Sequence, residues 1–422
     1  MRRTLATLLV SIMSLGVAAT NTPAPYIDTL DQPFDRYTWL TTHNAFNYGF
    51  TPVPNQTRHI PTQLNDGVRG LMLDFVESRG RVYLCHSICL FGELTLEATF
   101  NEQIMPFLRN DPRAILTLHV EDYASRSALH KALNSVPGLA RITFDPQTWN
   151  TPDWPTPQQM IGAGQRLLIF NLNNDNSGDF AVDEGNVHIM ASTDGTVEND
   201  WSLGDTIFTH DYTCKSRWGD IPLDRKSVAF PGKAWNRLFV MNQFHGVSLN
   251  LHARLDNRFD RLLDRVDNYC AGPAMRKPNF IAVDHYEQGD GLAFAGVATQ
   301  GGVVFHKGNH ATQDIVCGVP GRVPMDANIK NGDFMGCEDD EARSARIVDL
   351  PAGTRIGVYD SPDGSTNDDY TTIVLRRDIA NLIIPSFEIS DTNADREITF
   401  HRTNGLDGKI SRIVIDPPGS RP

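Results

Sequence analysis

The 422-residue sequence is short of positive charge, because 38 Lys and Arg residues face 51 Asp and Glu residues and leave a formal net charge of −13. This balance argues against a nucleic-acid partner, since proteins neutralise phosphate backbones with clusters of Lys and Arg. It also argues against electrostatic attachment to an anionic membrane. We therefore expect any contact with a membrane surface to be local, apolar and transient, and the sequence implies no protein partner.

Several well-known motifs are absent as well. The chain has no CxxC pair, which disfavours a zinc ribbon or a thioredoxin-like centre. It has no GxSxG segment, which disfavours a serine hydrolase. No GxGxxG loop follows the first expected strand, so a doubly wound dinucleotide-binding sheet is only the second choice of fold.

Long apolar runs are scarce, and the one near the N-terminus resembles an export signal. Arg2 and Arg3 precede a mostly apolar stretch, residues 4–17, that is too short to span a bilayer comfortably. Small residues suited to cleavage follow at 16–19. We expect residues 1–19 to be a signal peptide, with a membrane anchor as the alternative. The mature protein is then secreted, periplasmic or otherwise extracellular.

The six cysteines form an even set, as is typical of exported proteins with disulfides. Many pairings are formally open. The order of the cysteines along the chain favours Cys85–Cys89, Cys214–Cys270 and Cys317–Cys337.

Short apolar runs alternate with amphipathic stretches from about residue 35 to 290. The runs at 37–42, 70–76, 114–120, 166–171, 238–242 and 280–283 are expected strands, and 96–109, 125–135 and 254–266 are expected helices. Continuous apolar runs suit parallel strands that are buried on both faces. Pro106 should kink or shorten the first helix. This alternation predicts an α/β fold, a TIM-type (β/α) barrel of complete or irregular form over residues 20–295.

The composition changes after about residue 295. Gly, Asp, Asn, Thr and β-branched residues dominate, and turn signals recur at short intervals. This pattern is typical of an all-β structure. We place a boundary within 288–301 and expect residues 300–422 to form a small β-sandwich.

Polar residues end several of the expected strands. His43, Asp74, Glu121 and Asp284 occupy such positions, and His86 follows a short apolar segment. Each one alone has an ordinary explanation as a turn or capping residue. The carboxyl ends of barrel strands form one face, however, and that face carries the active site. If the barrel closes, the last strand neighbours the first and Asp284 reaches His43.

Five segments together resemble the phosphatidylinositol-specific phospholipase C X-domain family, especially its exported single-barrel members. They are WLTTHNAFN (39–47), NDGVRGLMLDF (65–75), YLCHS (83–87), ILTLHVEDY (115–123) and PNFIAVDHY (278–286). The resemblance implies a phosphodiesterase in which His43 is the general base and His86 the general acid. Its substrate would be a phosphatidylinositol-type lipid or another inositol phosphodiester.

The chemistry of such a reaction needs these residue types. A base removes the proton of the inositol 2-hydroxyl, which attacks phosphorus to give a cyclic phosphate, and an acid protonates the departing diacylglycerol oxygen. Histidine performs both roles near neutral pH, and we expect Asp284 to orient His43. The negative phosphoryl oxygens also need a cation.

In this family the cation is Ca²⁺ in one branch and an Arg in another. The resemblance makes Asn44 and Asp74 calcium ligands, and Glu121 can join them from the same strand face as His119. Two positions depart from the family pattern, because Met72 and His119 stand where carboxylates are expected. The ligand set is thus one carboxylate short. Arg69 has the opposite strand parity to Asp74 and should be structural.

Two alternatives remain open. One is another barrel phosphodiesterase, of the glycerophosphodiester or sphingomyelinase D kind, although Met72 disfavours it. The other is an inactive barrel that serves as a binding module, which the retention of both His43 and His86 disfavours.

The C-terminal part resembles the βγ-crystallin family. Residues 303–310 and 355–364 look like the openings of its two motifs, and 339–344 and 407–412 look like its calcium loops. Arg343, Gly408 and Arg412 depart from the loop pattern. The resemblance implies a β-sandwich more firmly than it implies bound Ca²⁺.

Overall fold

The computed structural model describes residues 30–49, 53–86, 89, 94–204, 209–330 and 336–420. The expected signal peptide, residues 1–19, lies outside these ranges. Within them, no helix is both long enough and apolar enough to pass through a bilayer.

Ten strands form the sheet of the N-terminal region. Eight of them are mutually parallel, in the order β7-β5-β4-β2-β1-β10-β9-β8, and β3 and β6 add to β2 and β7 in antiparallel fashion. The bounds are β1 Trp39–Thr42, β2 Gly70–Ser78, β3 Arg81–Leu84, β4 Leu116–Tyr123, β5 Leu167–Asn171, β6 Gly178–Val182, β7 Gly185–Ala191, β8 Thr196–Glu198, β9 Leu238–Gln243 and β10 Phe280–Val283. No ladder joins β7 to β8 among the described residues. The expected barrel is therefore present in its irregular, incomplete form.

All six predicted strands are confirmed, and the sheet curls around an aromatic core. Phe170 on β5 and Phe280 on β10 both contact the ring of His119 on β4, with centroid separations of 5.9 and 4.7 Å. Strands that are far apart in the sheet order thus meet in one interior. Apolar residues of the opposite parity pack outward against the helices.

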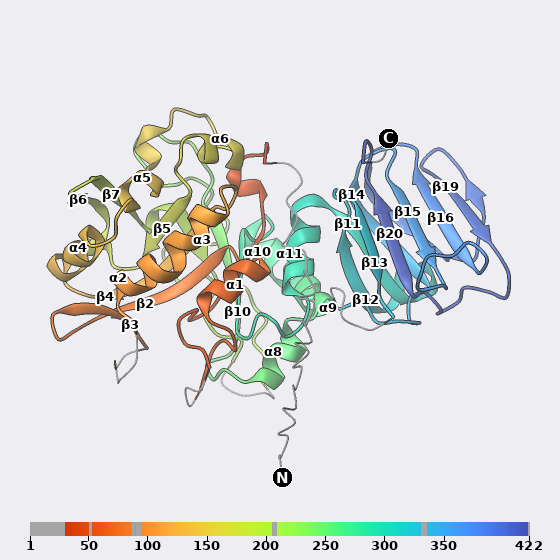
Figure 1. Cartoon of the computed structure of the whole chain (residues 1–422), viewed down its shortest axis with the longest axis horizontal. Coiled ribbons are helices and arrows are strands. Elements are labelled where there is room, and N and C mark those ends of the chain that lie inside the picture. Colours follow the sequence, from red (N-terminus) through yellow and green to blue (C-terminus); the bar gives the residue numbers. More distant parts are fainter. Residues whose placement is uncertain are drawn as a thin grey trace, which may run out of the picture.

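The helices lie around this sheet (Figure 1). They are α1 Ile60–Asp66, α2 Leu96–Thr99, α3 Met105–Asn110, α4 Arg126–Asn134, α5 Leu139–Ile142, α6 Pro157–Gly162, α7 Ser192–Gly195, α8 Asn250–Asp256, α9 Phe259–Asp264, α10 Ala271–Ala274 and α11 Gly291–Gln300. The predicted interruption near Pro106 is confirmed: a π-helical stretch, Phe100–Ile104, separates α2 from α3. A proline ring has no N–H to donate and is accommodated at the start of α3.

The single helix expected over 254–266 was wrong. The segment divides into α8 and α9, and the break falls at Asn257. The side-chain amide of Asn257 donates to the backbone carbonyl of Asp284 at 2.9 Å. The backbone carbonyl of Asn257 accepts from the Asp290 N–H at 2.8 Å. These long-range bonds outweigh the local helical pattern.

Two antiparallel sheets form the C-terminal region, the blue part of Figure 1. One has the order β12-β11-β14-β17 and the other β13-β20-β15-β16-β19-β18. Their bounds are β11 Gly302–Gly308, β12 Thr312–Pro320, β13 Met325–Asn328, β14 Ser344–Leu350, β15 Arg355–Tyr359, β16 Tyr370–Leu375, β17 Ile379–Ile384, β18 Asp391–Thr392, β19 Arg396–His401 and β20 Arg412–Asp416. An apolar core of their own lies between them. The predicted all-β region is present.

The segment in which we expect a boundary forms the buried helix α11 rather than an exposed linker (Figure 1). Thr299 at its end accepts from the Thr38 N–H at 2.9 Å and donates to the Thr38 carbonyl at 2.8 Å, next to β1. Gly296 of the same helix faces Pro320 of β12 without room for a Cβ. The helix therefore packs against both regions, and the division into two domains remains a prediction.

The three disulfides are those that the order of the cysteines favours. Cys85 pairs with Cys89, Cys214 with Cys270 and Cys317 with Cys337. No cysteine is left free. This complete pairing fits an oxidising compartment.

The contact between α9 and β12 gives a test of how the two regions pack. A Cβ at Gly318 would lie 2.0 Å from a ring carbon of Phe259. We expect Gly318→Ala to lower the free energy of unfolding by roughly 1–3 kcal/mol, the usual cost of overpacking. Urea unfolding measures this, with Gly272→Ala as the control because nothing lies within 4 Å of its Cβ. Equal stability of Gly318→Ala and wild type would contradict the packing.

Candidate active site

One cavity of about 460 Å³ lies at the carboxyl ends of the parallel strands. Five of the predicted site residues line it: His43, Asn44, Asp74, His86 and Glu121. Met72 and His119 also line it, together with Glu198, Arg217 and Phe244, which the sequence analysis did not single out. The sixth predicted residue, Asp284, does not line the cavity but contacts His43, which does.

The pairing of β1 with β10 brings His43 and Asp284 together. Thr42 lies opposite Val283 in a parallel register, so the residues that follow are neighbours. His43 Nδ1 lies 2.8 Å from Asp284 Oδ1. The ring of His43 also stacks on Phe244, with centroids 3.7 Å apart and planes at 5°.

These contacts fix the state of His43. The amide of Asn55 donates to the same oxygen of Asp284 at 3.0 Å. An ionised carboxylate can only accept, so His43 Nδ1 carries the proton of the His43–Asp284 bond. His43 Nε2 then keeps its lone pair, which is what a general base requires.

A second histidine–carboxylate pair joins β3 to β2. His86 follows β3, and its Nδ1 lies 2.9 Å from Oδ2 of Asp74 on β2. The His86 side chain is 67% exposed and that of Asp74 only 6%. The hydrogen bond to Asp74 raises the pKa of His86 above its ordinary value. Burial raises the pKa of Asp74. The pair thus holds a proton on an exposed imidazole that can give it up.

Arg217 lies between two carboxylates at the cavity. It donates to Glu121 at 2.6 Å and to Glu198 at 3.1 Å. Burial alone would lower the pKa of Arg217. The carboxylates of Glu198 and Glu121 raise it by more, so the pKa lies above its ordinary value. Burial alone would raise the pKa of Glu121. The ion pair with Arg217 outweighs that effect, so the pKa lies below its usual range. The guanidinium and Glu121 are therefore both ionised.

The predicted calcium ligands line the cavity together, but each has another partner. The Asn44 amide donates to Asn55 at 3.3 Å, Asp74 binds His86, and Glu121 binds Arg217. Glu198 supplies the carboxylate that the predicted set lacks. Its oxygen, however, accepts from Arg217 and from the Asn242 amide. With a guanidinium between Glu121 and Glu198, the donor set in this arrangement does not fit Ca²⁺.

Arg69 and His119 take no part in the hydrogen bonds that join the polar side chains of the cavity. The Arg69 guanidinium donates to the carbonyls of Leu64 and Val68 and pairs with Asp111 at 3.3 Å, as expected of a structural residue. His119 is half-buried, and the burial of its ring lowers its pKa to about 3. It therefore forms a neutral part of the cavity floor.

Sequence patterns gave little sign of the additional site residues. Glu198 ends β8, which has only three residues and falls below the length at which a strand pattern is visible. Arg217 lies in a segment without helix or strand periodicity. Asn55 and Phe244 acquire their importance from contacts with residues that are distant along the chain.

The two expected calcium loops of the β region lie next to each other. Ser411 donates to Asp339 at 2.7 Å, and Arg343 pairs with Asp407 at 3.0 Å. The departure at Arg343 therefore places a positive charge between the loops. Calcium binding there remains a prediction.

The PI-PLC X family model (PI-PLC X 1) matches residues 30–222. Residues 30–222 are therefore similar to the PI-PLC X family. The matched segment contains His43, Asp74, His86, Glu121 and Arg217, whereas Asp284 lies beyond it.

Two curated relatives are also similar to this chain. A PI-PLC X domain-containing protein of Arabidopsis thaliana is 30% identical over 275 residues, which cover 61% of this chain and 60% of the relative. An uncharacterized secreted protein of Arthroderma benhamiae is 28% identical over 167 residues, which cover 38% and 37%. The chain thus matches less than two thirds of either relative's length.

Two solved structures also share features with the chain. Phosphatidylinositol-specific phospholipase C from Staphylococcus aureus is 12% identical, with a TM-score of 0.37 over 61% of this chain and 89% of that one. A βγ-crystallin domain from Flavobacterium johnsoniae is 17% identical, with a TM-score of 0.16 over 28% of this chain and 98% of that one. At these TM-scores no conclusion follows from either likeness.

The two histidine environments at the cavity give a test that needs no substrate. We expect the pKa of His86 to lie above that of a free imidazole and to fall in Asp74→Asn, because the hydrogen bond that raises it is weakened. His119 should not titrate near neutral pH, since its pKa is about 3. Histidine-selective NMR titration measures both. An unchanged His86 pKa in Asp74→Asn would contradict the pairing.

Proposed function

We propose that the protein is an exported phosphoric diester hydrolase that cleaves phosphatidylinositol-type lipids through a cyclic inositol phosphate. One observation carries the proposal: two histidines, each hydrogen-bonded to its own carboxylate, share a cavity with a half-buried guanidinium. Acid–base chemistry on a phosphodiester needs these three functions together. The match of residues 30–222 to the PI-PLC X family model supports the same reaction class.

Each step has a residue that can perform it. His43 Nε2 takes the proton of the inositol 2-hydroxyl, and Asp284 stabilises the imidazolium that forms. The 2-oxygen then bonds to phosphorus as the bond from phosphorus to the diacylglycerol oxygen breaks. His86 gives its proton to that departing oxygen. The products are diacylglycerol and a cyclic inositol phosphate, and the proton on His43 restores His86 through water.

Arg217 supplies the positive charge in this proposal. Its guanidinium is permanently charged, and one of its carboxylate contacts is replaced by a phosphoryl oxygen when substrate enters. Such a fixed donor stabilises the negative charge that develops on the phosphoryl oxygens. Calcium remains the alternative, and its binding would require Glu121 and Glu198 to release Arg217.

Exposed apolar side chains support a transient contact with a lipid surface. Trp201 and Val53 line the cavity and are exposed, as are Val247, Leu249 and Leu251 on the segment that follows Gly246 of the cavity wall. Apolar side chains at the rim compensate for the excess of negative charge, which disfavours electrostatic binding. Export is supported by three disulfides, by the expected signal peptide and by a relative whose name describes a secreted protein.

The paired histidines give the first test of the function. We expect His43→Ala and His86→Ala each to lower turnover of a soluble inositol phosphodiester by at least ~10²-fold, the scale for losing general acid–base help. Asp284→Asn should lower the rate while the protein stays folded. His401→Ala, an exposed histidine of the β region, is the control. Near-wild-type turnover in a folded His86→Ala protein would contradict the mechanism. A wild-type protein that binds inositol phosphates without cleaving the phosphodiester would favour the inactive barrel that serves as a binding module.

The role of Arg217 separates the two cation schemes. We expect Arg217→Lys to lower the rate by roughly 10²-fold, because an ammonium cannot reproduce the two-pronged donation of a guanidinium. Arg141→Lys, which is 73% exposed, is the matched control. Millimolar CaCl₂ added to calcium-free wild type should change the rate less than about twofold, well below the ~10²-fold expected of the essential cation. Strict dependence of wild-type activity on calcium would instead favour the calcium scheme.

A further inference from the structure

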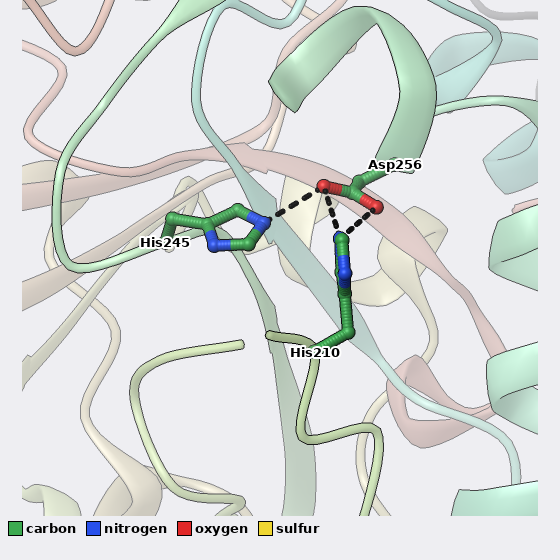
Figure 2. A group of neighbouring side chains, drawn as sticks. All are labelled: His210, His245 and Asp256. Carbon is green, nitrogen blue, oxygen red and sulfur yellow. Dashed lines mark hydrogen bonds and ion pairs between the residues drawn. The ribbon is translucent and has the colours of Figure 1, made fainter. Parts of the chain in front are cut away.

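A second group of ligand-type side chains lies around Asp256, next to the cavity. His210 Nε2 is 3.1 and 3.3 Å from the two carboxylate oxygens, and His245 Nε2 is 2.9 Å from Oδ2 (Figure 2). The ligand atoms of these three residues all lie within 4.8 Å of one another. His245 follows β9, Asp256 ends α8, and His210 comes from the segment before Cys214. Nothing in the proposed reaction uses them.

The second nitrogen of His245 constrains its protonation. His245 Nδ1 lies 3.1 Å from the carbonyl oxygen of Gly204. A carbonyl can only accept, so Nδ1 carries a proton and a neutral His245 turns the lone pair of Nε2 toward the carboxylate. Two lone pairs at 2.9 Å repel each other unless a cation lies at or between them. Metal-bound histidines typically donate their other N–H to a carbonyl in this way.

A metal ion between these atoms satisfies this arrangement. His245 and Asp256 are 4% and 3% exposed, so the lone pair and the carboxylate lie largely out of reach of water. His252 lies beside them, with its ring centroid 4.3 Å from that of His245. Both ring nitrogens of His252 are buried without a well-formed hydrogen bond among the described residues. Three imidazoles, those of His210, His245 and His252, thus gather beside the single carboxylate of Asp256.

We propose that His210, His245 and Asp256 bind a divalent transition-metal ion, zinc, at a site separate from the phosphodiester cavity. Tetrahedral zinc with bonds of about 2.0–2.1 Å to imidazole and carboxylate holds its ligand atoms ~3.3 Å apart. Asp256 Oδ2 lies 2.9 Å from His245 Nε2 and 3.3 Å from His210 Nε2, which is close to this spacing. The His210 side chain is 25% exposed, which gives the ion a path of entry and leaves water a place in the fourth position.

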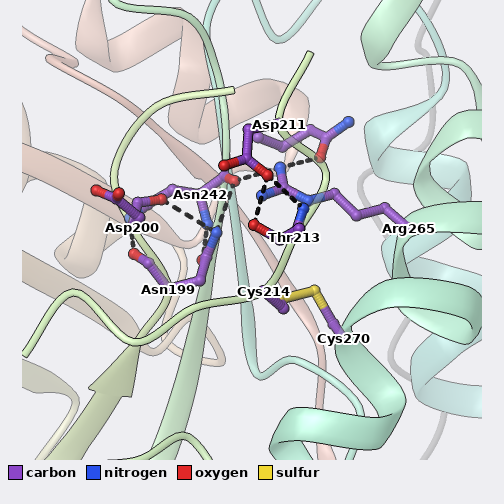
Figure 3. Close-up of a disulfide and its surroundings, with 9 residues drawn as sticks. Asn199, Asp200, Asp211, Thr213, Cys214, Asn242, Arg265 and Cys270 are labelled. Atoms are coloured by element: carbon purple, nitrogen blue, oxygen red, sulfur yellow. Dashed lines mark hydrogen bonds between the residues drawn. A yellow bond between two sulfur atoms is a disulfide. The ribbon is translucent and has the colours of Figure 1, made fainter. Parts of the chain in front are cut away.

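The site would hold the segment that delivers Arg217. His210 lies before Cys214 in the sequence and Arg217 lies after it. The disulfide from Cys214 to Cys270 ties the middle of this segment to the helical stretch that follows α9 (Figure 3). Zinc at His210 would tie its beginning to β9 and α8. His245 also follows Phe244, the residue that stacks on His43.

The test measures metal rather than activity. Tag-free protein is stripped with a chelator and titrated with ZnCl₂ by calorimetry, and bound zinc is counted by mass spectrometry. We expect about one zinc ion per chain, as for a single structural site, in wild type and in His130→Ala, which removes an exposed histidine on α4. His210→Ala and Asp256→Asn should bind zinc at least ~10-fold more weakly, as the loss of one ligand entails.

A folding check and a second metal show whether a loss of zinc binding reflects a lost ligand or an unfolded protein. His210 is partly exposed, so His210→Ala should fold even if Asp256→Asn does not, and circular dichroism checks both. Cobalt in place of zinc should give the visible absorption of a tetrahedral ion in wild type and lose it in His210→Ala. Wild type without stoichiometric zinc, or zinc bound equally by His210→Ala and Asp256→Asn, would overturn the proposal. Since no substrate is used, the result does not depend on the proposed phosphodiesterase activity.

Discussion

The candidate site depends on the position of β1 between β10 and β2. Thr42 pairs with Val283 on one side and with Leu71 on the other. This arrangement places Asp284 beside His43 although 241 positions separate them. A slip of one residue would turn these side chains to opposite faces of the sheet. Gly70 permits the close approach to β1, because a Cβ there would lie 2.1 Å from the Thr41 hydroxyl oxygen.

Charge balance is the second constraint, and it links the site to its surroundings. Asp74, Glu121, Glu198 and Asp284 concentrate negative charge at a cavity meant, in our proposal, for an anionic phosphodiester. His86 and Arg217 offset that charge, and Arg217 comes from a segment with neither helix nor strand. Such a segment needs fixed points to hold a guanidinium in place. The Cys214–Cys270 disulfide is one, and the proposed zinc site would be another.

The sequence was most informative where a feature is local. Apolar runs identified the six predicted strands, Pro106 marked an interruption, and the order of the cysteines gave all three disulfides. Polar residues after apolar runs identified His43 and Asp284 as strand-end neighbours, because parallel strands place like ends together. The family resemblance located His86, which stands beside Asp74.

The features that were missed depend on long-range contacts. The break between α8 and α9 arises from the bonds of Asn257 to residues after β10, and α11 is a helix because both regions pack on it. Glu198 and Arg217 converge with Glu121 only in the folded chain. The sequence analysis named Asp74 and Glu121 but not the contacts that they make with His86 and Arg217. Calcium binding at these residues stays a prediction.

The most direct measurement of the central claim is phosphorus NMR of the products formed from phosphatidylinositol vesicles. The account predicts that the mature protein converts the lipid phosphodiester to a cyclic inositol phosphate, with diacylglycerol left in the membrane. A linear inositol phosphate would then appear only later, as the cyclic product is hydrolysed. Release of phosphatidic acid or of a glycerophosphate, or no change in the lipid signal with folded protein, would contradict it.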